Sequence, residues 1–170
     1  MNTTPTTSAG LRSRKILFVC HGNICRSPMA EYYFRHASQQ AKAGALFDVA
    51  SAAVSSEEVG NPVYPPAAAM LAQHGIDCRD KRARQVTTHD FEYYDLLIAM
   101  DQSNLRALRR MAARLGTEAE RKVSLLLDHT PSSDAAHHAR DVADPWYTGD
   151  FRRAWDDIVA GCQALLHTLL

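Results

Sequence analysis

The sequence has little of several things, and each shortage excludes a class of protein. Four cysteines in 170 residues are too few for a small secreted domain held together by disulfides. Charge of neither sign is in excess, because 19 Lys and Arg balance 19 Asp and Glu, which argues against a general nucleic-acid binder. No apolar run approaches the length of a membrane span. We therefore expect a cytoplasmic protein that neither binds nucleic acid nor enters a membrane.

The length and composition that remain are those of one ordinary globular domain. Apolar residues make up 46% of the chain and charged residues 22%, which is normal for a folded protein. Residues 1–14 are rich in Thr and Ser and lack the apolar segment of a secretory signal. We expect a disordered tail over residues 1–14 and a single domain over residues 15–170.

Short apolar runs alternate with helical patterns along the chain. Strands are expected at residues 16–19, 47–54, within 94–100, and at 123–127. Helices are expected at residues 28–42, 67–74, 101–115 and 151–170. Strands that alternate with helices indicate an α/β domain built on a parallel sheet.

The sharpest motif, residues 20–27, lies between the first expected strand and the first expected helix. Cys20 and Arg26 stand there in the arrangement C-x5-R. Successive backbone N–H groups in such a loop bind an oxyanion, and the following helix adds its positive dipole end. A guanidinium holds two phosphate oxygens, and the same positive field stabilises a cysteine thiolate. The loop can therefore hold a nucleophile beneath a phosphoryl group.

The neighbouring residue types suit this loop. Gly22 permits the backbone to turn, and Asn23 can brace the loop through its amide. Ser27 is expected to cap the helix that Pro28 begins, to donate a hydrogen bond to Cys20, or both. The alternative, a buried structural cysteine with an unrelated arginine, is disfavoured by the position of the motif after a strand and before Ser-Pro.

Phosphoryl transfer to sulfur also needs an acid for the departing oxygen. Asp144 is the leading candidate because Pro145 stiffens its backbone, and Trp146 and Tyr147 could form walls for a flat leaving group. Spacing alone slightly favours a simple aspartate turn with packed aromatic residues. Asp141 and Asp101 are the next candidates.

These motifs resemble the low-molecular-weight protein tyrosine phosphatase family. The similar segments are residues 19–28, 60–62, 74–76, 83–85, 100–105 and 144–145. The similarity runs from Lys15 to the C-terminus. It implies a single three-layer domain, with helices on both faces of a four-stranded parallel sheet and a phosphate-binding loop after the first strand. It implies neither a metal nor another cofactor.

The resemblance also implies roles for individual residues. Cys20 would be the nucleophile that becomes phosphocysteine, Arg26 would bind the phosphate and stabilise the transition state, and Asp144 would act as general acid and then as base. Residues that would surround the substrate or hold the loop are His21, Gly22, Asn23, Ile24, Cys25, Ser27, Trp146 and Tyr147. The implied partners are phosphate or another oxyanion in the loop and a phosphotyrosine-containing protein, with a tyrosine kinase as one candidate.

Three positions leave questions open. Cys25 matches the family's second loop cysteine, and both plain packing and a reversible disulfide with Cys20 remain open. Glu57-Glu58 stand where many members have an aromatic wall, which indicates a preference for basic surroundings in the substrate. Lys81 stands where many members have a histidine, so the usual brace to Asn23 is expected to differ.

Other readings of the same residues are weaker. One alternative is a protein-arginine phosphatase, which resembles this family but has a threonine where this chain has Ile24. Ile24 looks like the tyrosine-specific form. A thiol-dependent arsenate reductase needs two further cysteines near the loop, and Cys78 and Cys162 are far apart in sequence. A non-catalytic phosphopeptide-binding module would need the loop and Arg26 but neither Cys20 nor Asp144. Because both of these residues are present, this alternative is weak. A zinc site from Cys20, Cys25, His137 and His138 has poor spacing.

Overall fold

A parallel sheet forms the centre of the computed structural model, which describes residues 12–131 and 140–170. Within those ranges four strands pair in the order β2-β1-β3-β4, all parallel. The strands are β1 (Arg14–Cys20), β2 (Phe47–Ala53), β3 (Leu96–Ala99) and β4 (Val123–Leu125). The expected N-terminal tail falls largely on residues 1–11, outside the described part, and β1 begins one residue before the expected domain boundary.

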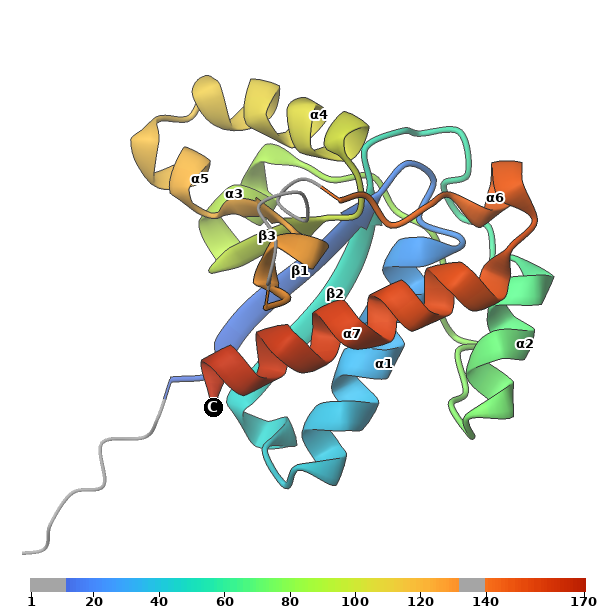
Figure 1. The fold of residues 1–170 in the computed structure, drawn as a ribbon. Helices are drawn as coiled ribbons and strands as arrows, with labels where there is room; N and C mark the ends of the chain where they lie inside the picture. The colour runs from blue at the N-terminus through green and yellow to red at the C-terminus, as the bar shows by residue number, and fades with distance from the viewer. Residues whose placement is uncertain (1–11, 132–139) are drawn as a thin grey trace, which may run out of the picture.

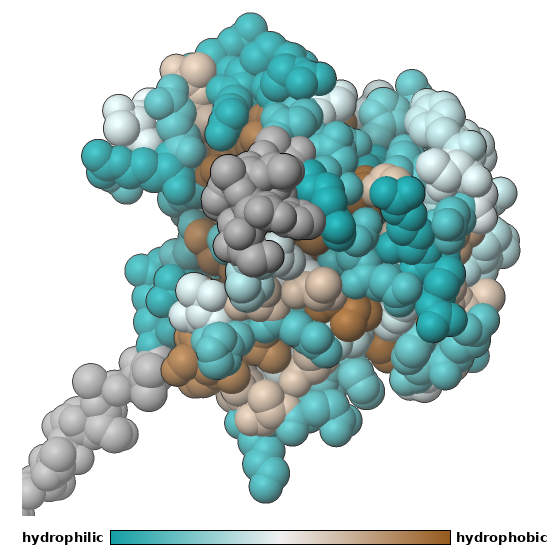
Figure 2. All heavy atoms as spheres, viewed as in Figure 1, coloured by the Kyte–Doolittle hydropathy of each residue, from teal (hydrophilic) through white to brown (hydrophobic). Residues whose placement is uncertain are grey.

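Helices cover both faces of this sheet (Figure 1). They are α1 (Arg26–Gln40), α2 (Pro65–Gln73), α3 (Thr88–Tyr93), α4 (Gln102–Ala113), α5 (Thr117–Arg121), α6 (Pro145–Thr148) and α7 (Phe151–Leu169). Short 3-10 turns span Gly44–Leu46 and Leu126–His129. The expected three-layer α/β architecture is confirmed. Among the described helices, none is long and apolar enough to cross a membrane. The face of the molecule drawn in Figure 2 is mostly hydrophilic, with smaller hydrophobic patches between the polar residues.

The alternation of side chains along β1 separates two hydrophobic cores. Ile16, Phe18 and Cys20 face the core that α1, α2 and α7 cover. Leu17 and Val19 face the core beneath α3, α4 and α5. Because both faces are buried, the strand has the continuous apolar pattern typical of a parallel sheet. The strand therefore delivers Cys20 to the carboxyl edge of the sheet, where α/β proteins bind ligands.

Local boundaries differ from the sequence expectations for identifiable reasons. The first helix begins at Arg26, and Cys25 occupies the N-cap position, so Ser27 does not cap it. The Ser27 side chain points instead to Cys20, with its Oγ 3.0 Å from Cys20 Sγ. The short helices α3, α5 and α6 were not expected, because segments of four to six residues are too short to show a helical period.

Candidate active site

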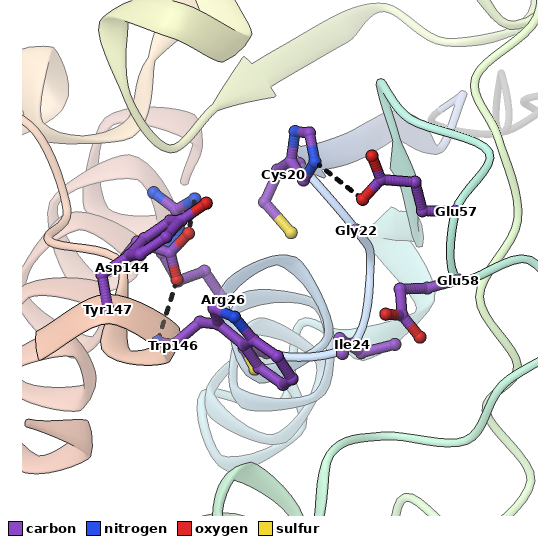
Figure 3. Close-up of a pocket in the computed structure, with 11 residues that line it drawn as sticks. Cys20, Gly22, Ile24, Arg26, Glu57, Glu58, Asp144, Trp146 and Tyr147 are labelled. Carbon is purple, nitrogen blue, oxygen red and sulfur yellow. Dashed lines mark hydrogen bonds and ion pairs between the residues drawn. The ribbon is translucent and has the colours of Figure 1, made fainter. Parts of the chain in front are cut away.

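A cavity of about 130 Å³ opens at the carboxyl end of β1. Its walls come from three segments that are distant in sequence: the loop after β1, the connection between β2 and α2, and the start of α6 (Figure 3). The lining residues are Cys20, His21, Gly22, Ile24, Cys25, Arg26, Glu57, Glu58, Asp144, Trp146 and Tyr147. Most of the residues expected to form the site therefore surround one cavity, while Asn23 and Ser27 lie behind it.

Cys20 is buried, 3% exposed, and accepts polar contacts at its sulfur. The backbone N–H of Asn23 donates to Sγ at 3.3 Å, and the Ser27 hydroxyl lies 3.0 Å from it. Hydrogen bonds to a charged acceptor are the stronger kind, so both contacts favour a thiolate over a thiol. The loop after β1 and the first turn of α1 together supply these donors.

The orientation of the Asn23 amide determines which way the Ser27 hydroxyl points. Asn23 is 1% exposed and has a left-handed backbone with φ 60°. Its Oδ1 accepts from the backbone N–H of Arg84 at 3.1 Å, which leaves Nδ2 to donate to Ser27 at 2.8 Å and to Ser51 at 2.9 Å. Because Ser27 Oγ accepts from Asn23, its own proton is free to donate to Cys20.

A buried ion pair lies at the other end of this network. The Ser51 hydroxyl donates to the carboxylate of Glu31, which is 3% exposed. Lys81 Nζ lies 3.2 Å from Glu31 Oε2 and donates to the Ser51 carbonyl at 3.0 Å. Burial lowers the pKa of Lys81, and Glu31 opposes that effect. Lys81 thus supports Asn23 indirectly, through Glu31 and Ser51.

Arg26 is almost completely enclosed, with 2% of its surface exposed. Nη1 donates to Asp101 at 2.7 Å and to the carbonyl of Val142 at 2.9 Å, while Nη2 donates to Asp144 at 3.2 Å. Burial alone would lower its pKa, but the negative charges of Cys20, Asp144 and Asp101 outweigh burial and raise it. The guanidinium is therefore a fixed cation at the floor of the cavity.

Asp144 reaches the cavity because the chain before it is attached to β3. The backbone N–H of Val142 donates to the carbonyl of Met100, just after that strand, at 2.9 Å. Asp144 Oδ1 then accepts from the N–H of Trp146 at 3.1 Å and caps α6. Its other oxygen, Oδ2, accepts from Arg26. One carboxylate thus serves both the helix and the site.

The two rival aspartates have other partners. Asp101 caps α4 by accepting from the N–H of Asn104 at 2.7 Å, and it also holds Arg26. Asp141 Oδ1 accepts from the N–H of Gln102 at 2.9 Å. Neither is among the residues that line the cavity. The geometry therefore favours Asp144 over both for a proton transfer at this site.

Aromatic and acidic residues lie on opposite sides of the cavity (Figure 3). Trp146 and Tyr147 of α6 are 54% and 83% exposed. The ring centroids of Tyr64 and Trp146 are 5.0 Å apart, so Tyr64 packs against the aromatic side. Glu57 and Glu58 stand on the other side. The side chain of His21 points outward to Glu57, at 3.4 Å.

The other cysteines are poor nucleophiles where they lie. Burial, followed by the charge of Cys20, raises the pKa of Cys25 to about 12. Burial also raises the pKa of Cys78 and of Cys162, and neither lines the cavity. In the described ranges, no three His, Cys, Asp or Glu are placed to hold a metal ion. His137 and His138 of the zinc alternative lie outside those ranges.

Two features of the site gave no local signal in the sequence. Glu31 is one of many carboxylates within helices, and its burial depends on how α1 packs against β2. The contact of Asp101 with Arg26 depends on β1 and β3 being neighbours in the sheet. Knowledge of how distant elements pack together, rather than a motif, would have been needed to find either one.

Comparison with known proteins agrees with this geometry. The family model described as low molecular weight phosphotyrosine protein phosphatase matches residues 15–170. A low molecular weight protein-tyrosine-phosphatase of Bacillus subtilis (strain 168), YfkJ, is 38% identical over 154 residues, 91% of this chain and 94% of the relative. The low molecular weight phosphotyrosine protein phosphatase of Homo sapiens is 36% identical over 156 residues, with the same shares covered.

Solved structures show the same fold. The crystal structure of YfkJ superposes with a TM-score of 0.84 over 92% of this chain and 94% of that one. A Drosophila protein described as an arginine phosphatase is 32% identical, with a TM-score of 0.81 over 91% of this chain and 97% of that one. On the family match and the identity of these relatives, the chain belongs to the low molecular weight phosphotyrosine protein phosphatases, a family of hydrolases.

Proposed function

We propose that this protein hydrolyses phosphotyrosine in protein substrates through a phosphocysteine intermediate on Cys20. One observation carries the proposal: the sulfur of Cys20 and the guanidinium of Arg26 line the same cavity at the end of β1. A nucleophile and a bidentate oxyanion binder at one point are what phosphoryl transfer to sulfur needs.

In the first step the substrate phosphate binds Arg26 and the loop. It takes the place of Asp144 on Nη2, while Asp101 and the Val142 carbonyl keep Nη1 in position. The Cys20 thiolate attacks phosphorus, and the bond to the tyrosine oxygen breaks. Asp144, in its protonated form, transfers its proton to that oxygen. The products of this step are tyrosine and a cysteinyl phosphate.

In the second step water attacks the same phosphorus. Asp144, now a carboxylate, accepts a proton from the water, and the phosphorus–sulfur bond breaks. Inorganic phosphate leaves, and the thiolate is restored with its hydrogen bonds from Asn23 and Ser27. Arg26 neutralises the charge that develops on the phosphoryl oxygens in both steps. No cofactor takes part in this scheme.

Several features support a phosphotyrosine substrate within a protein. The exposed rings of Trp146 and Tyr147 offer an aromatic wall for the leaving group. Ile24 lines the cavity, and its branched side chain narrows the space that a phosphorylated guanidinium would occupy, which disfavours phosphoarginine. A tyrosine kinase is one candidate partner. We place the activity in the cytoplasm, where a reducing environment keeps the Cys20 thiol free.

A comparison of substrates tests this proposal. Peptides that carry phosphotyrosine, phosphoserine or phosphoarginine in the same sequence are offered side by side, with Cys20→Ser as the control for contaminating activity. We expect hydrolysis of the phosphotyrosine peptide to dominate. Dominant hydrolysis of phosphoarginine, as in the name of the Drosophila relative, would replace the proposed substrate. Phosphoserine as the best substrate would contradict the proposed role of the aromatic wall in binding the leaving group.

Asp144→Asn tests the proton donor, because asparagine retains the cap of α6 but carries no acidic proton. We expect kcat for phosphotyrosine to fall by about 10²- to 10³-fold. The loss should be smaller for p-nitrophenyl phosphate, whose leaving group needs no proton. Asp141→Asn is the matched control, since Asp141 lies outside the cavity. If Asp141→Asn slows phosphotyrosine hydrolysis more than Asp144→Asn does, the acid is assigned to the wrong residue.

A further inference from the structure

The wall that faces the aromatic rings is acidic. Glu57 and Glu58 belong to a turn at residues 57–60 in the connection between β2 and α2, and both line the cavity that holds Cys20 (Figure 3). Two carboxylates alone would not define a site. Here they form the rim of a cavity whose floor takes the phosphate, so they lie beside the residues that flank a bound phosphotyrosine.

This turn is held beside the phosphate loop, residues 20–27. Glu58 Oε2 accepts from Asn61 Nδ2 at 2.6 Å, and the Glu58 stem lies so close to Gly22 that an added Cβ there would come within 3.3 Å of it. Gly60 N–H donates to the Ala83 carbonyl at 2.8 Å, and Ala83 N–H donates to the Asn61 carbonyl at 2.9 Å. The turn and the Glu58 side chain therefore keep their place relative to the phosphate loop, and Glu57 projects from the same turn.

The charge at the rim is opposite to the charge at the floor. Arg26 is the one Lys or Arg among the described residues that line the cavity, and it is 2% exposed and engaged by Asp101 and Asp144. The side chain of Glu57 is 72% exposed, with the His21 ring at 3.4 Å. A substrate thus meets a cation at the floor and carboxylates at the rim.

We propose that Glu57 and Glu58 determine substrate specificity by selecting phosphotyrosines with a Lys or Arg within two residues. This inference rests on the proposed phosphotyrosine hydrolysis and adds the sequence context of the substrate. A cationic side chain beside the phosphotyrosine pairs with the rim carboxylates, whereas an acidic one is repelled by them. The two residues act on recognition, and neither takes part in the bond changes at phosphorus.

The expected preference is modest because the rim is exposed to water. Ion pairs of this kind change binding by a few fold each, so the ratio of kcat/KM for basic over acidic peptides should be about tenfold at low ionic strength. The ratio should shrink toward one as salt is added, because the screening length falls to about 3 Å at 1 M. A preference that came from shape alone would not respond to salt.

The test uses the full chain and three phosphotyrosine peptides of one length, flanked by Arg, Ala or Glu. Glu57→Gln should lower the Arg-to-Glu ratio to about threefold, and the double variant Glu57→Gln/Glu58→Gln should bring it to within about twofold. The change should come from both sides, as slower hydrolysis of the Arg peptide and faster hydrolysis of the Glu peptide. The double variant Glu57→Lys/Glu58→Lys should invert the order, which loss of a merely structural contact would not do.

The matched control is Glu118→Gln/Glu120→Gln on α5, which removes the same charge from exposed positions that do not line the cavity. It should retain the wild-type ratio. Equal hydrolysis of all three peptides by the wild type, or the same loss of preference in the α5 variant, would overturn the inference and leave the proposed function standing. Failure to hydrolyse any of the three peptides would refute the proposed function and the inference together.

Discussion

Cys20→Ser is expected to lower kcat for aryl phosphates by at least about 10⁴-fold while the protein still binds inorganic phosphate. Serine retains the shape of the side chain, but its hydroxyl stays protonated where the sulfur would be an anion. Both contacts at Sγ, from Asn23 N–H and the Ser27 hydroxyl, favour an anion there. Removal of that negative charge leaves Arg26 and the loop free to bind phosphate at least as tightly.

The matched control for this variant is Cys25→Ser in the same loop. The pKa of Cys25 is raised to about 12, so this thiol is protonated at neutral pH and does not compete as a nucleophile. Steady-state kinetics and calorimetric titration with phosphate measure the two properties separately. If Cys25→Ser abolished turnover and Cys20→Ser retained it, the nucleophile would be Cys25 and our assignment of Cys20 would be wrong.

Arg26→Lys is expected to lower kcat/KM by about 10²- to 10³-fold and to weaken phosphate binding, although the charge is conserved. Asp101, the Val142 carbonyl and Asp144 are all held by the two terminal nitrogens of Arg26. A single ammonium group has no planar fork with which to hold the phosphate and these acceptors together. Arg26→Ala should lose both turnover and phosphate binding.

The control for Arg26 is another arginine in a two-point pair. Arg84 binds both oxygens of Asp90, each at 3.0 Å, and does not line the cavity. Arg84→Lys should keep most activity, since its backbone N–H still supports Asn23. Thermal unfolding of each variant separates lost catalysis from lost folding. Equal phosphate affinity in Arg26→Lys and the wild type would refute the role of the guanidinium fork.

The parts of this protein that could be predicted from sequence are those encoded in neighbouring residues. The apolar run before Cys20, the C-x5-R spacing and the Ser-Pro that follows are contiguous, so together they predicted a strand, a phosphate loop and a helix. Even there, the helix begins at Arg26, because Cys25 takes the cap position that Ser27 was expected to fill. The Ser27 side chain is used at the nucleophile instead.

The parts that could not be predicted depend on contacts between distant segments. Asp101 appeared only as a rival acid, yet it anchors Arg26 because β1 and β3 are adjacent. Lys81 was expected to alter the support of Asn23, but its route through Glu31 and Ser51 follows from burial of α1 against the sheet. Neither effect is encoded in a spacing along the chain.

During turnover the sulfur of Cys20 is expected to become covalently bonded to phosphorus. Phosphorus-31 NMR of the Asp144→Asn protein, denatured with alkali during reaction with p-nitrophenyl phosphate, tests this bond directly, because loss of the base should let the intermediate accumulate and sulfur-bound phosphate survives in alkali. We expect a resonance typical of sulfur-bound phosphate, which should be absent from Cys20→Ser. Peptide mass spectrometry should locate the phosphate on Cys20. Phosphate found on another residue, or turnover without any phosphorylated enzyme, would contradict the proposed intermediate.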